Sequence, residues 1–338
     1  MNSSINITRF FQRTTATFLA STLCISALLS PLFTLPVSGQ SNLQTVDALR
    51  PKVVLALGGG GTRGAAHIGV LRALQQEGIT VDAVVGTSMG ALIGGLYCAG
   101  MNLDDIEQIF YHKRLIHAFD TVPIPVRIAV IPIMFIPHLF GYHSYDGLYR
   151  GNKFANYLAG LVPSDKQNIE TYKPTFWAIG TNLLDGEPYA VKKGNIGRAI
   201  QASSAIPQLR RPVEIDEALL VDGGMVENLP VEHAAQMNCD YIIAVDVDED
   251  LSVLPAANFR AIGSVARRVI NINLSHIDRH QRKLASTIIH PDVSGINLLS
   301  LNKKDARRAV IAGEKAAQQA MPSIKQQLAE IAKKKSDQ

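Results

Sequence analysis

The serine at position 88 lies in a sequence that fits the pattern G-x-S-x-G, Gly86-Thr87-Ser88-Met89-Gly90. An apolar run precedes the motif and a helical pattern follows it, and between a strand and a helix this motif forms a nucleophile elbow. The sharp turn holds the serine in strained backbone geometry, and a glycine two positions away on each side leaves room for it. The motif therefore predicts Ser88 as the nucleophile of an acyl-transfer reaction, with Gly86 and Gly90 shaping its turn.

A glycine-rich loop follows the apolar run at residues 52–57, with the sequence Gly59, Gly60, Gly61, Thr62, Arg63 and Gly64. Its spacing fits G-x-G-x-x-G, but a dinucleotide site also needs an acidic residue at the end of the second strand. The acidic residue in this region, Asp82, lies at the start of that strand instead. A phosphate-binding P-loop would need Gly-Lys-Ser/Thr, which is absent. The remaining interpretation is an oxyanion hole built from backbone N–H groups. We expect Gly60 and Gly61 to be the donors, while Arg63 either stiffens the loop or neutralises a substrate phosphate.

A carboxylate follows a later apolar run, because Asp222 ends the sequence "LLVD" and two glycines come after it. A side chain at the carboxyl end of a strand lies at the crevice where open α/β sheets bind ligands. An aspartate with a pKa near 3.9 is a weak base for a hydroxyl, and burial would raise that pKa. The position favours Asp222 as the base for Ser88, although an ordinary Asp-Gly turn gives the same sequence.

The elements that must position these residues alternate between strand and helix patterns. Apolar strands are expected at residues 52–57, 81–86, 175–182, 218–224 and 240–247, with helices between them. Continuous apolar strands separated by helices predict one α/β domain, with a mainly parallel sheet covered on both faces. The C-terminal stretch, residues 305–335, has a helical pattern that we expect to break at Pro322.

Composition narrows the functional class. Hydrophobic residues make up 47% of the 338 residues and charged residues 18%, which is typical of a globular core. Part of the net charge of +4 lies in Arg9 and Arg13 near the N-terminus and in the lysines at 333–335. The body of the chain is therefore near neutral and predicts no nucleic-acid partner. The three cysteines have neither a disulfide framework nor a metal-ligand spacing.

Two apolar segments bear on export and on contact with a membrane. Residues 1–39 carry two arginines ahead of an apolar stretch and contain no Asp or Glu, which predicts a signal peptide or an N-terminal membrane anchor. The protein would then be exported, as a periplasmic, secreted or membrane-associated protein, or else anchored in the membrane. Residues 122–142 are apolar but rich in proline, so they form either an irregular loop on the core or a lid that meets lipid.

Four motifs in order resemble the bacterial patatin-like phospholipases: "GGGGTRGAAHIGVL", "GTSMG", "QASSAIP" and "LLVDGGMVENLPV", within residues 53–247. The resemblance implies a three-layer α/β/α sandwich and a Ser88–Asp222 dyad without histidine, with residues 59–64 shaping the oxyanion hole. It also implies hydrolysis of acyl esters of phospholipids, lysophospholipids or neutral lipids, generally without a metal. We expect a phospholipid or lysophospholipid substrate, contact with a membrane surface and no cofactor. We expect a catalytic core at residues 50–250 and a helical and strand extension at 251–338, packed on the same domain.

Two alternatives stay open at this point. Because His233 and His290 follow Asp222 in the chain, an α/β-hydrolase triad in the order Ser, Asp, His is available, whereas His67 is expected to be structural. A membrane-associated lipid-binding protein that keeps the fold without turnover is the second alternative.

Overall fold

The computed structural model describes residues 50–111, 115, 145–261, 263–298, 300 and 302–337. The predicted leader at residues 1–39 and the proline-rich segment at 122–142 lie outside these residues.

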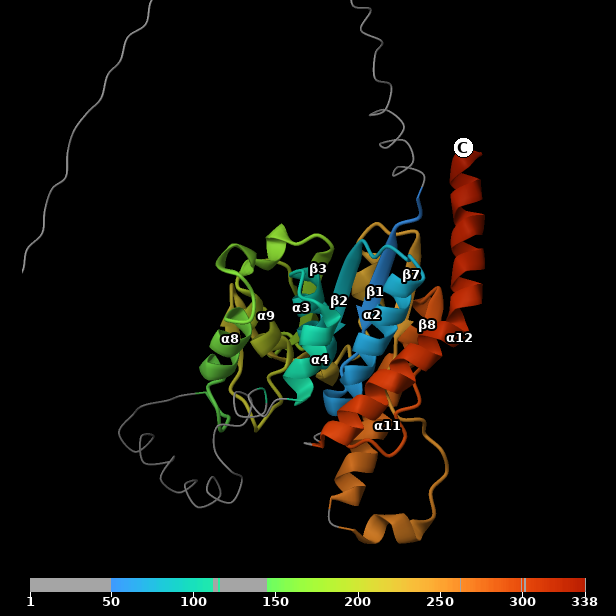
Figure 1. Ribbon diagram of the computed structural model, residues 1–338. Coiled ribbons are helices and arrows are strands. Elements are labelled where there is room, and N and C mark those ends of the chain that lie inside the picture. The colour runs from blue at the N-terminus through green and yellow to red at the C-terminus, as the bar shows by residue number, and fades with distance from the viewer. Residues whose placement is uncertain are drawn as a thin grey trace, which may run out of the picture. The chain divides into compact units, whose positions relative to one another are not determined.

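An eight-stranded mixed sheet forms the centre of the described structure (Figure 1). Its strand order is β5-β6-β3-β2-β1-β7-β8, and β4 pairs with β3 beside this path. The five strands β3, β2, β1, β7 and β8 are parallel, while β4, β5 and β6 form antiparallel pairs. The strands are β1 Val53–Leu57, β2 Ala83–Thr87, β3 Thr175–Asn182, β4 Pro188–Val191, β5 Val213–Ile215, β6 Ala218–Asp222, β7 Tyr241–Val245 and β8 Thr287–Ile289.

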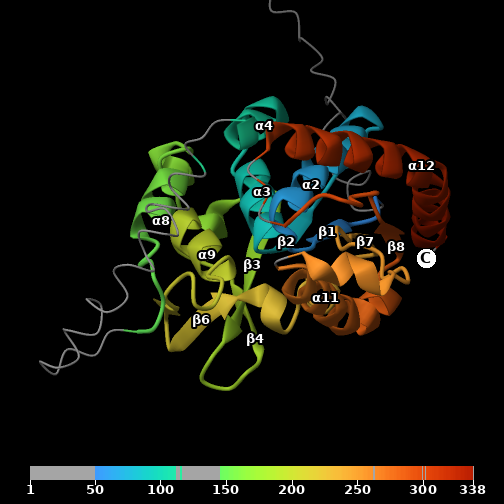
Figure 2. The same cartoon turned by 90° about the horizontal axis from the view of Figure 1, so that it is seen from below.

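Helices cover both faces of this sheet, as Figure 2 shows. The α-helices are α2 Ala66–Gln76, α3 Met89–Cys98, α4 Leu103–Tyr111, α8 Asn152–Ala159, α9 Ile196–Ser203, α10 Val231–Ala235, α11 Ser264–Leu284 and α12 Lys303–Ser336. The short 3-10 helices are η1 Gly61–Ala65, η2 Ser164–Lys166, η3 Ile169–Thr171, η4 Gly223–Met225 and η5 Ala256–Arg260.

Alternation along the buried strands creates two cores. In β1, Val53, Leu55 and Leu57 join the larger core, which also contains apolar residues of α2, α3, α9 and α12. Val54 and Ala56 point to the opposite face and join a smaller core with residues of α10. Every residue of β1 is buried, which explains why its sequence is continuously apolar. The predicted three-layer α/β/α sandwich with a mainly parallel sheet is confirmed.

The prediction of a helix break at Pro322 is wrong. Helix α12 continues through this residue from Lys303 to Ser336, and Figures 1 and 2 show that it bends along its length. The buried side chains Ala317, Met321 and Ile324 lie on both sides of the proline, so packing on the core holds the helix together despite the lost backbone hydrogen bond.

Close packing of α12 on α2 fixes the element that follows the glycine loop. A side chain on Gly69 of α2 would overlap the Val310 carbonyl, and one on Gly313 of α12 would overlap the Ala66 carbonyl. The two backbones can approach this closely only because both positions are glycine. The glycine loop and η1 are therefore followed by a rigid helix pair.

Candidate active site

Ser88 occupies the tight turn between β2 and α3. Its φ of 53° and ψ of −111° lie in a region that residues with side chains rarely adopt, so the turn stores backbone strain. A Cβ on Gly86 would clash with the backbone of Gly90, and a Cβ on Gly90 would clash with the Leu57 carbonyl. Both flanking positions therefore require glycine, and the turn has the geometry of a nucleophile elbow.

The Ser88 Oγ donates a hydrogen bond to Asp222 Oδ2 at 3.0 Å. The other carboxylate oxygen, Asp222 Oδ1, accepts the Gly224 N–H at 2.9 Å, which fixes the plane of the carboxylate. The Thr181 hydroxyl also donates to the Asp222 backbone carbonyl at 2.9 Å, which ties this residue to β3. The structure thus brings together the two side chains singled out in the sequence as nucleophile and base.

Asp222 reaches Ser88 by a route that the sequence argument did not anticipate. We placed the carboxylate at the carboxyl edge of a parallel sheet, but β6 runs antiparallel to β3. The two strands overlap only at the last residues of β3, where Asp222 pairs with Gly180. The preceding residue of β3, Ile179, pairs with Thr87 at the end of β2. This short antiparallel register, rather than a shared carboxyl edge, carries the carboxylate back to the elbow.

Burial makes Asp222 a stronger base than an ordinary carboxylate. Its side chain is 5% exposed, and desolvation raises its pKa from 3.8 to about 6, against the opposing effect of the hydrogen bonds from Gly224 and Ser88. The carboxylate still ionises at neutral pH and can then accept the Ser88 proton.

The glycine loop presents two backbone donors. Within it, the N–H groups of Gly59, Thr62 and Arg63 donate to backbone carbonyls of Asn228, Leu298 and Gly60. The N–H groups of Gly60 and Gly61 have no acceptor among the described residues. These are the two residues that the sequence indicated as oxyanion donors.

Contacts around Gly59 and Gly64 hold the loop against the elbow. A Cβ on Gly59 would lie 3.3 Å from the Ser88 Cβ and would clash with the Asn228 side chain. One on Gly64 would clash with Met89, the residue after Ser88. Both glycines therefore permit close approach of the loop to the serine.

Arg63 anchors the loop from within the protein. Its side chain is 1% exposed, its Nε donates to the Ile296 carbonyl at 2.7 Å, and its Nη2 lies 2.8 Å from Glu249 Oε2. Nη1 also contacts Asn271 Oδ1 at 3.3 Å. Because the side chain is buried and all three of its nitrogens contact these groups, the geometry favours a stiffening role over recognition of a substrate phosphate.

Ser203 is a residue of the site that the sequence argument did not assign. Its hydroxyl accepts the Ser88 N–H at 2.8 Å and donates to the Ile179 carbonyl at 2.5 Å. The hydroxyl therefore satisfies the backbone of the strained turn. The only signal in the sequence was its place in the motif "QASSAIP", which carried no role by itself.

A family model described as patatin-like phospholipase matches residues 55–235. The chain belongs to the patatin-like phospholipase family. The matched range contains the glycine loop, the elbow and Asp222, and it ends before α11, β8 and α12.

Curated relatives match a little over half of the chain. An uncharacterised NTE family protein of Mycobacterium tuberculosis is 35% identical over 198 residues, which are 59% of this chain and 49% of that protein. A lysophospholipase of Scheffersomyces stipitis is 32% identical over 197 residues, 58% of this chain and 12% of that protein. The chain thus spans about half the length of the mycobacterial relative.

Among solved structures, a human group IVD cytosolic phospholipase A2 in complex with a fluorophosphonate matches with a TM-score of 0.46 and 13% identity. The match covers 86% of this chain and 60% of that one. The family assignment does not depend on it, because the family model matches the sequence directly.

The histidines considered for a triad are engaged elsewhere. His233 Nδ1 hydrogen-bonds Glu227 at 2.5 Å, and His290 lies 3.6 Å from Asp246 and 3.3 Å from Asp250. His67 is fully buried against the Gly58 carbonyl, and burial lowers its pKa to about 4. Among the described residues, none of these rings hydrogen-bonds Ser88 or Asp222, so the triad alternative has no support from the contacts.

Three buried aspartates lie close enough to be tested as metal ligands. One oxygen each of Asp246, Asp248 and Asp278 lies within 4.8 Å of the others. Arg282 Nε donates to Asp246 at 2.6 Å and its Nη2 lies 3.6 Å from Asp248. Burial also raises the pKa of Asp248 and of Asp278, which favours their protonated forms. Arg282 thus already brings positive charge to this cluster, and the expected absence of a cofactor stays a prediction.

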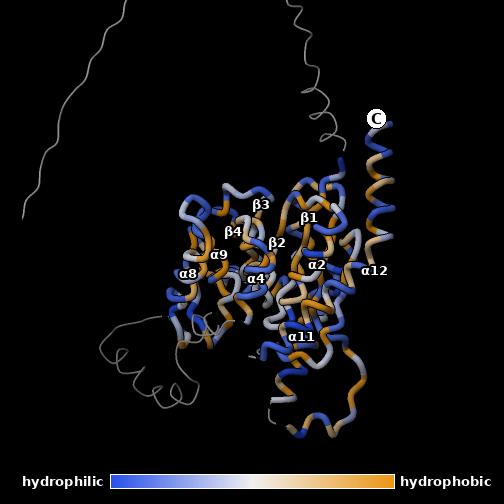
Figure 3. Tube along the Cα trace, viewed as in Figure 1, coloured by the Kyte–Doolittle hydropathy of each residue, from blue (hydrophilic) through white to orange (hydrophobic). Residues whose placement is uncertain are grey.

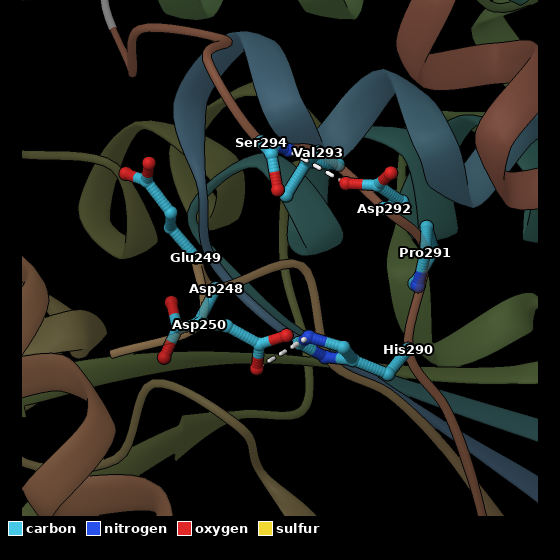
Figure 4. Close-up of a pocket in the computed structure, with 8 residues that line it drawn as sticks. All are labelled: Asp248, Glu249, Asp250, His290, Pro291, Asp292, Val293 and Ser294. Atoms are coloured by element: carbon cyan, nitrogen blue, oxygen red, sulfur yellow. Dashed lines mark hydrogen bonds and ion pairs between the residues drawn. The ribbon is translucent and has the colours of Figure 1, made fainter. Parts of the chain in front are cut away.

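A pocket of about 200 Å³ lies beside this cluster, and Figure 4 shows the acidic side chains and the histidine around it. Its lining does not include Ser88 or Asp222. It is formed by Asp248, Glu249, Asp250, His290, Pro291, Asp292, Val293 and Ser294.

Among the helices that the structure describes, none combines the length and apolar character needed to cross a bilayer.

Proposed function

We propose that this protein is a serine lipid acyl hydrolase that cleaves carboxylic esters of phospholipids or lysophospholipids. The observation that carries the proposal is the 3.0 Å hydrogen bond from the strained Ser88 to the buried Asp222. The family assignment supports a lipid ester as the substrate class. The lysophospholipase among the relatives supports the same class.

In the first half of the reaction, the Ser88 Oγ attacks the ester carbonyl carbon while Asp222 accepts its proton. The carbonyl oxygen gains negative charge. The N–H groups of Gly60 and Gly61, which have no acceptor among the described residues, donate hydrogen bonds to it. The tetrahedral intermediate then expels the alcohol, which takes the proton from Asp222. The fatty acyl group remains bonded to Ser88.

In the second half, water replaces the alcohol. The water oxygen attacks the acyl carbon while Asp222 accepts a proton from that water. The same N–H groups stabilise the second oxyanion. Collapse of this intermediate breaks the bond to Ser88, whose oxygen recovers the proton. The fatty acid leaves, and the hydrogen bond between Ser88 and Asp222 re-forms.

The raised pKa of Asp222 supports its role as the base in both halves. A carboxylate with a pKa of about 6 binds a proton more strongly than one with a pKa of 3.8. Its orientation by the Gly224 N–H leaves Oδ2 directed at the serine. The base therefore needs no histidine between it and the nucleophile.

The proposal extends to where the enzyme works. An export signal or anchor in residues 1–39 and a substrate held in a bilayer would place the reaction at a membrane surface. The composition of those residues, with two arginines ahead of an apolar stretch and no acidic residue, supports this part of the proposal.

The test measures fatty acid released from a panel of phospholipids and lysophospholipids by the purified protein and two variants. Ser88→Ala should abolish release, because no other group supplies the nucleophile. Ser204→Ala is a matched control, since among the described residues the Ser204 hydroxyl bonds to the Ile200 carbonyl of the preceding helix α9 and to no group of the active site. It should retain activity. Retained release by folded Ser88→Ala, or no release by the unaltered protein, would contradict the proposal and favour a binding protein without turnover.

A further inference from the structure

The segment after β7 exposes an unusual amount of apolar surface. We call Leu251–Ala261 and Gly263–Ile270 the arm; it comprises the connection through η5 and the first turns of α11. In Figure 1 it is the orange segment that extends below the rest of α11, and Figure 3 shows apolar positions along it. Val253 is 98% exposed, and five more large apolar side chains on the arm are at least 37% exposed: Leu251, Leu254, Val265, Val269 and Ile270.

These side chains share one region of the surface. The Arg268 Nη2 donates to the Ser252 carbonyl at 2.7 Å, which holds the start of the arm against the first turns of α11. Val265 and Val269 are one helical turn apart and therefore lie on the same face of α11. Such a concentration of exposed apolar residues marks an interaction surface rather than the scattered exposure found on any protein.

The positive charge of the arm indicates which kind of partner it would bind. Between Asp250 and Asp278 the sequence contains no Asp or Glu, whereas Arg260, Arg267 and Arg268 lie on the arm. The acidic residues at its root are already paired, because Glu249 contacts Arg63 and Asp250 contacts His290. Exposed apolar side chains interleaved with arginines fit the interface of a bilayer that carries anionic lipids.

Both ends of the arm are tied to the glycine loop. Arg63 of that loop binds Glu249, just before the arm, and Asn271, just after it. Val247, four residues before the arm, lies where a side chain on Gly60 would contact it. A surface that bound to the arm would therefore lie beside the loop that faces Ser88.

We propose that the arm docks the protein on a membrane surface containing anionic phospholipid, and so holds the active site next to its substrate. The proposal rests on the proposed function in one respect, that the substrate is a membrane lipid. On binding, Val253 and Val269 enter the apolar boundary of the bilayer while the arginines contact lipid phosphates. Arg63 joins both ends of the arm to the glycine loop through Glu249 and Asn271.

The experiment measures co-sedimentation with phosphatidylcholine vesicles, with and without phosphatidylglycerol. The unaltered protein should bind the anionic vesicles and lose binding at high salt. Val253→Asp combined with Val269→Asp should lower the partition coefficient by at least about tenfold. Arg260→Gln should lower it about fivefold at low salt, because one cationic contact is lost. Ile311→Asp on α12, at a residue 57% exposed, is the matched control and should bind like the unaltered protein.

Hydrolysis of a soluble short-chain ester separates the two proposals. The Val253→Asp/Val269→Asp variant should cleave the soluble ester at the unaltered rate and lose hydrolysis of vesicle lipid in parallel with binding. If the unaltered protein cleaves no ester, the proposed function fails, while the vesicle comparison still decides the docking. Should the double variant unfold, Val253→Asp alone is the substitute, since this side chain makes almost no buried contact.

Three results would overturn the docking proposal. One is equal vesicle binding by the unaltered protein and the arm variant. Another is equal loss of binding in the Ile311→Asp control. The third is a dimer in sedimentation analysis that the arm variant converts to a monomer without any vesicle binding, because the apolar face would then belong to a second copy of the chain.

Discussion

Replacing Asp222 with asparagine should stabilise the protein while disabling it. Asparagine has the same shape, and its Oδ1 can still accept the Gly224 N–H that now reaches the carboxylate. The variant removes only the ability to carry negative charge. Because Asp222 is 5% exposed and its pKa is raised mainly by desolvation, the ionised form is costly in the folded state.

The size of the effect follows from the shift in pKa. A rise from 3.8 to about 6 means that ionised Asp222 lowers the free energy of unfolding. About two pK units at ~1.4 kcal/mol each give roughly 3 kcal/mol. The folded-state pKa lies above the unfolded-state value. The roughly 3 kcal/mol that protonated Asp222 adds to the free energy of unfolding is therefore fully present below pH ~4 and is lost as the pH rises through about 6. The free energy of unfolding of Asp222→Asn should therefore exceed that of the unaltered protein by about 3 kcal/mol at pH 8 and by almost nothing at pH 4.

The assay is urea unfolding of both proteins at pH 4 and pH 8, together with ester hydrolysis at pH 8. The hydrolysis rate should fall at least about a thousandfold, because asparagine cannot accept the serine proton. A stability gain that is the same at both pH values would refute the desolvation argument. A variant less stable than the unaltered protein at pH 8 would refute it as well.

Three further predictions concern the same site. Lowering the pH through about 6 should reduce kcat/KM tenfold per pH unit as Asp222 takes up a proton, and a flat profile from pH 8 to pH 4 would exclude it as the base. Ser203→Ala leaves the Ser88 N–H without its acceptor and should cost about 1–3 kcal/mol in urea unfolding, whereas Ser204→Ala should cost less; equal costs would contradict the role of Ser203 in the turn. Gly60→Ala pushes the loop away from Val247 and should lower kcat a hundred- to a thousandfold with little change in KM, and a change in kcat under threefold would remove Gly60 from the oxyanion hole.

The sequence revealed those parts of the molecule that depend on local patterns. The eight residues of β3 agree with the predicted strand at 175–182, because its run Phe176–Ile179 is apolar and lies inside the sheet, between β2 and β6. The glycines around Ser88 and in the loop were visible for a similar reason, since close backbone approach accepts no other residue.

Contacts between segments that are distant in the chain could not be predicted from the sequence. The pairing of Asp222 with Gly180 depends on an antiparallel register that no local pattern specifies. Asp278 on α11 accepts the Leu229 N–H at 2.8 Å and the Asn228 amide at 2.9 Å, and so supports the segment that binds Gly59. The polar and exposed residues of α11 conceal such a role until the helix is placed beside Asn228.

The most direct measurement for the central claim, an activated Ser88 beside Asp222, is covalent labelling with a fluorophosphonate followed by peptide mapping. The account predicts one adduct, on the peptide that contains Ser88, formed much more slowly in Asp222→Asn and absent in Ser88→Ala. An adduct on another residue, or equal labelling rates in the unaltered protein and Asp222→Asn, would contradict it.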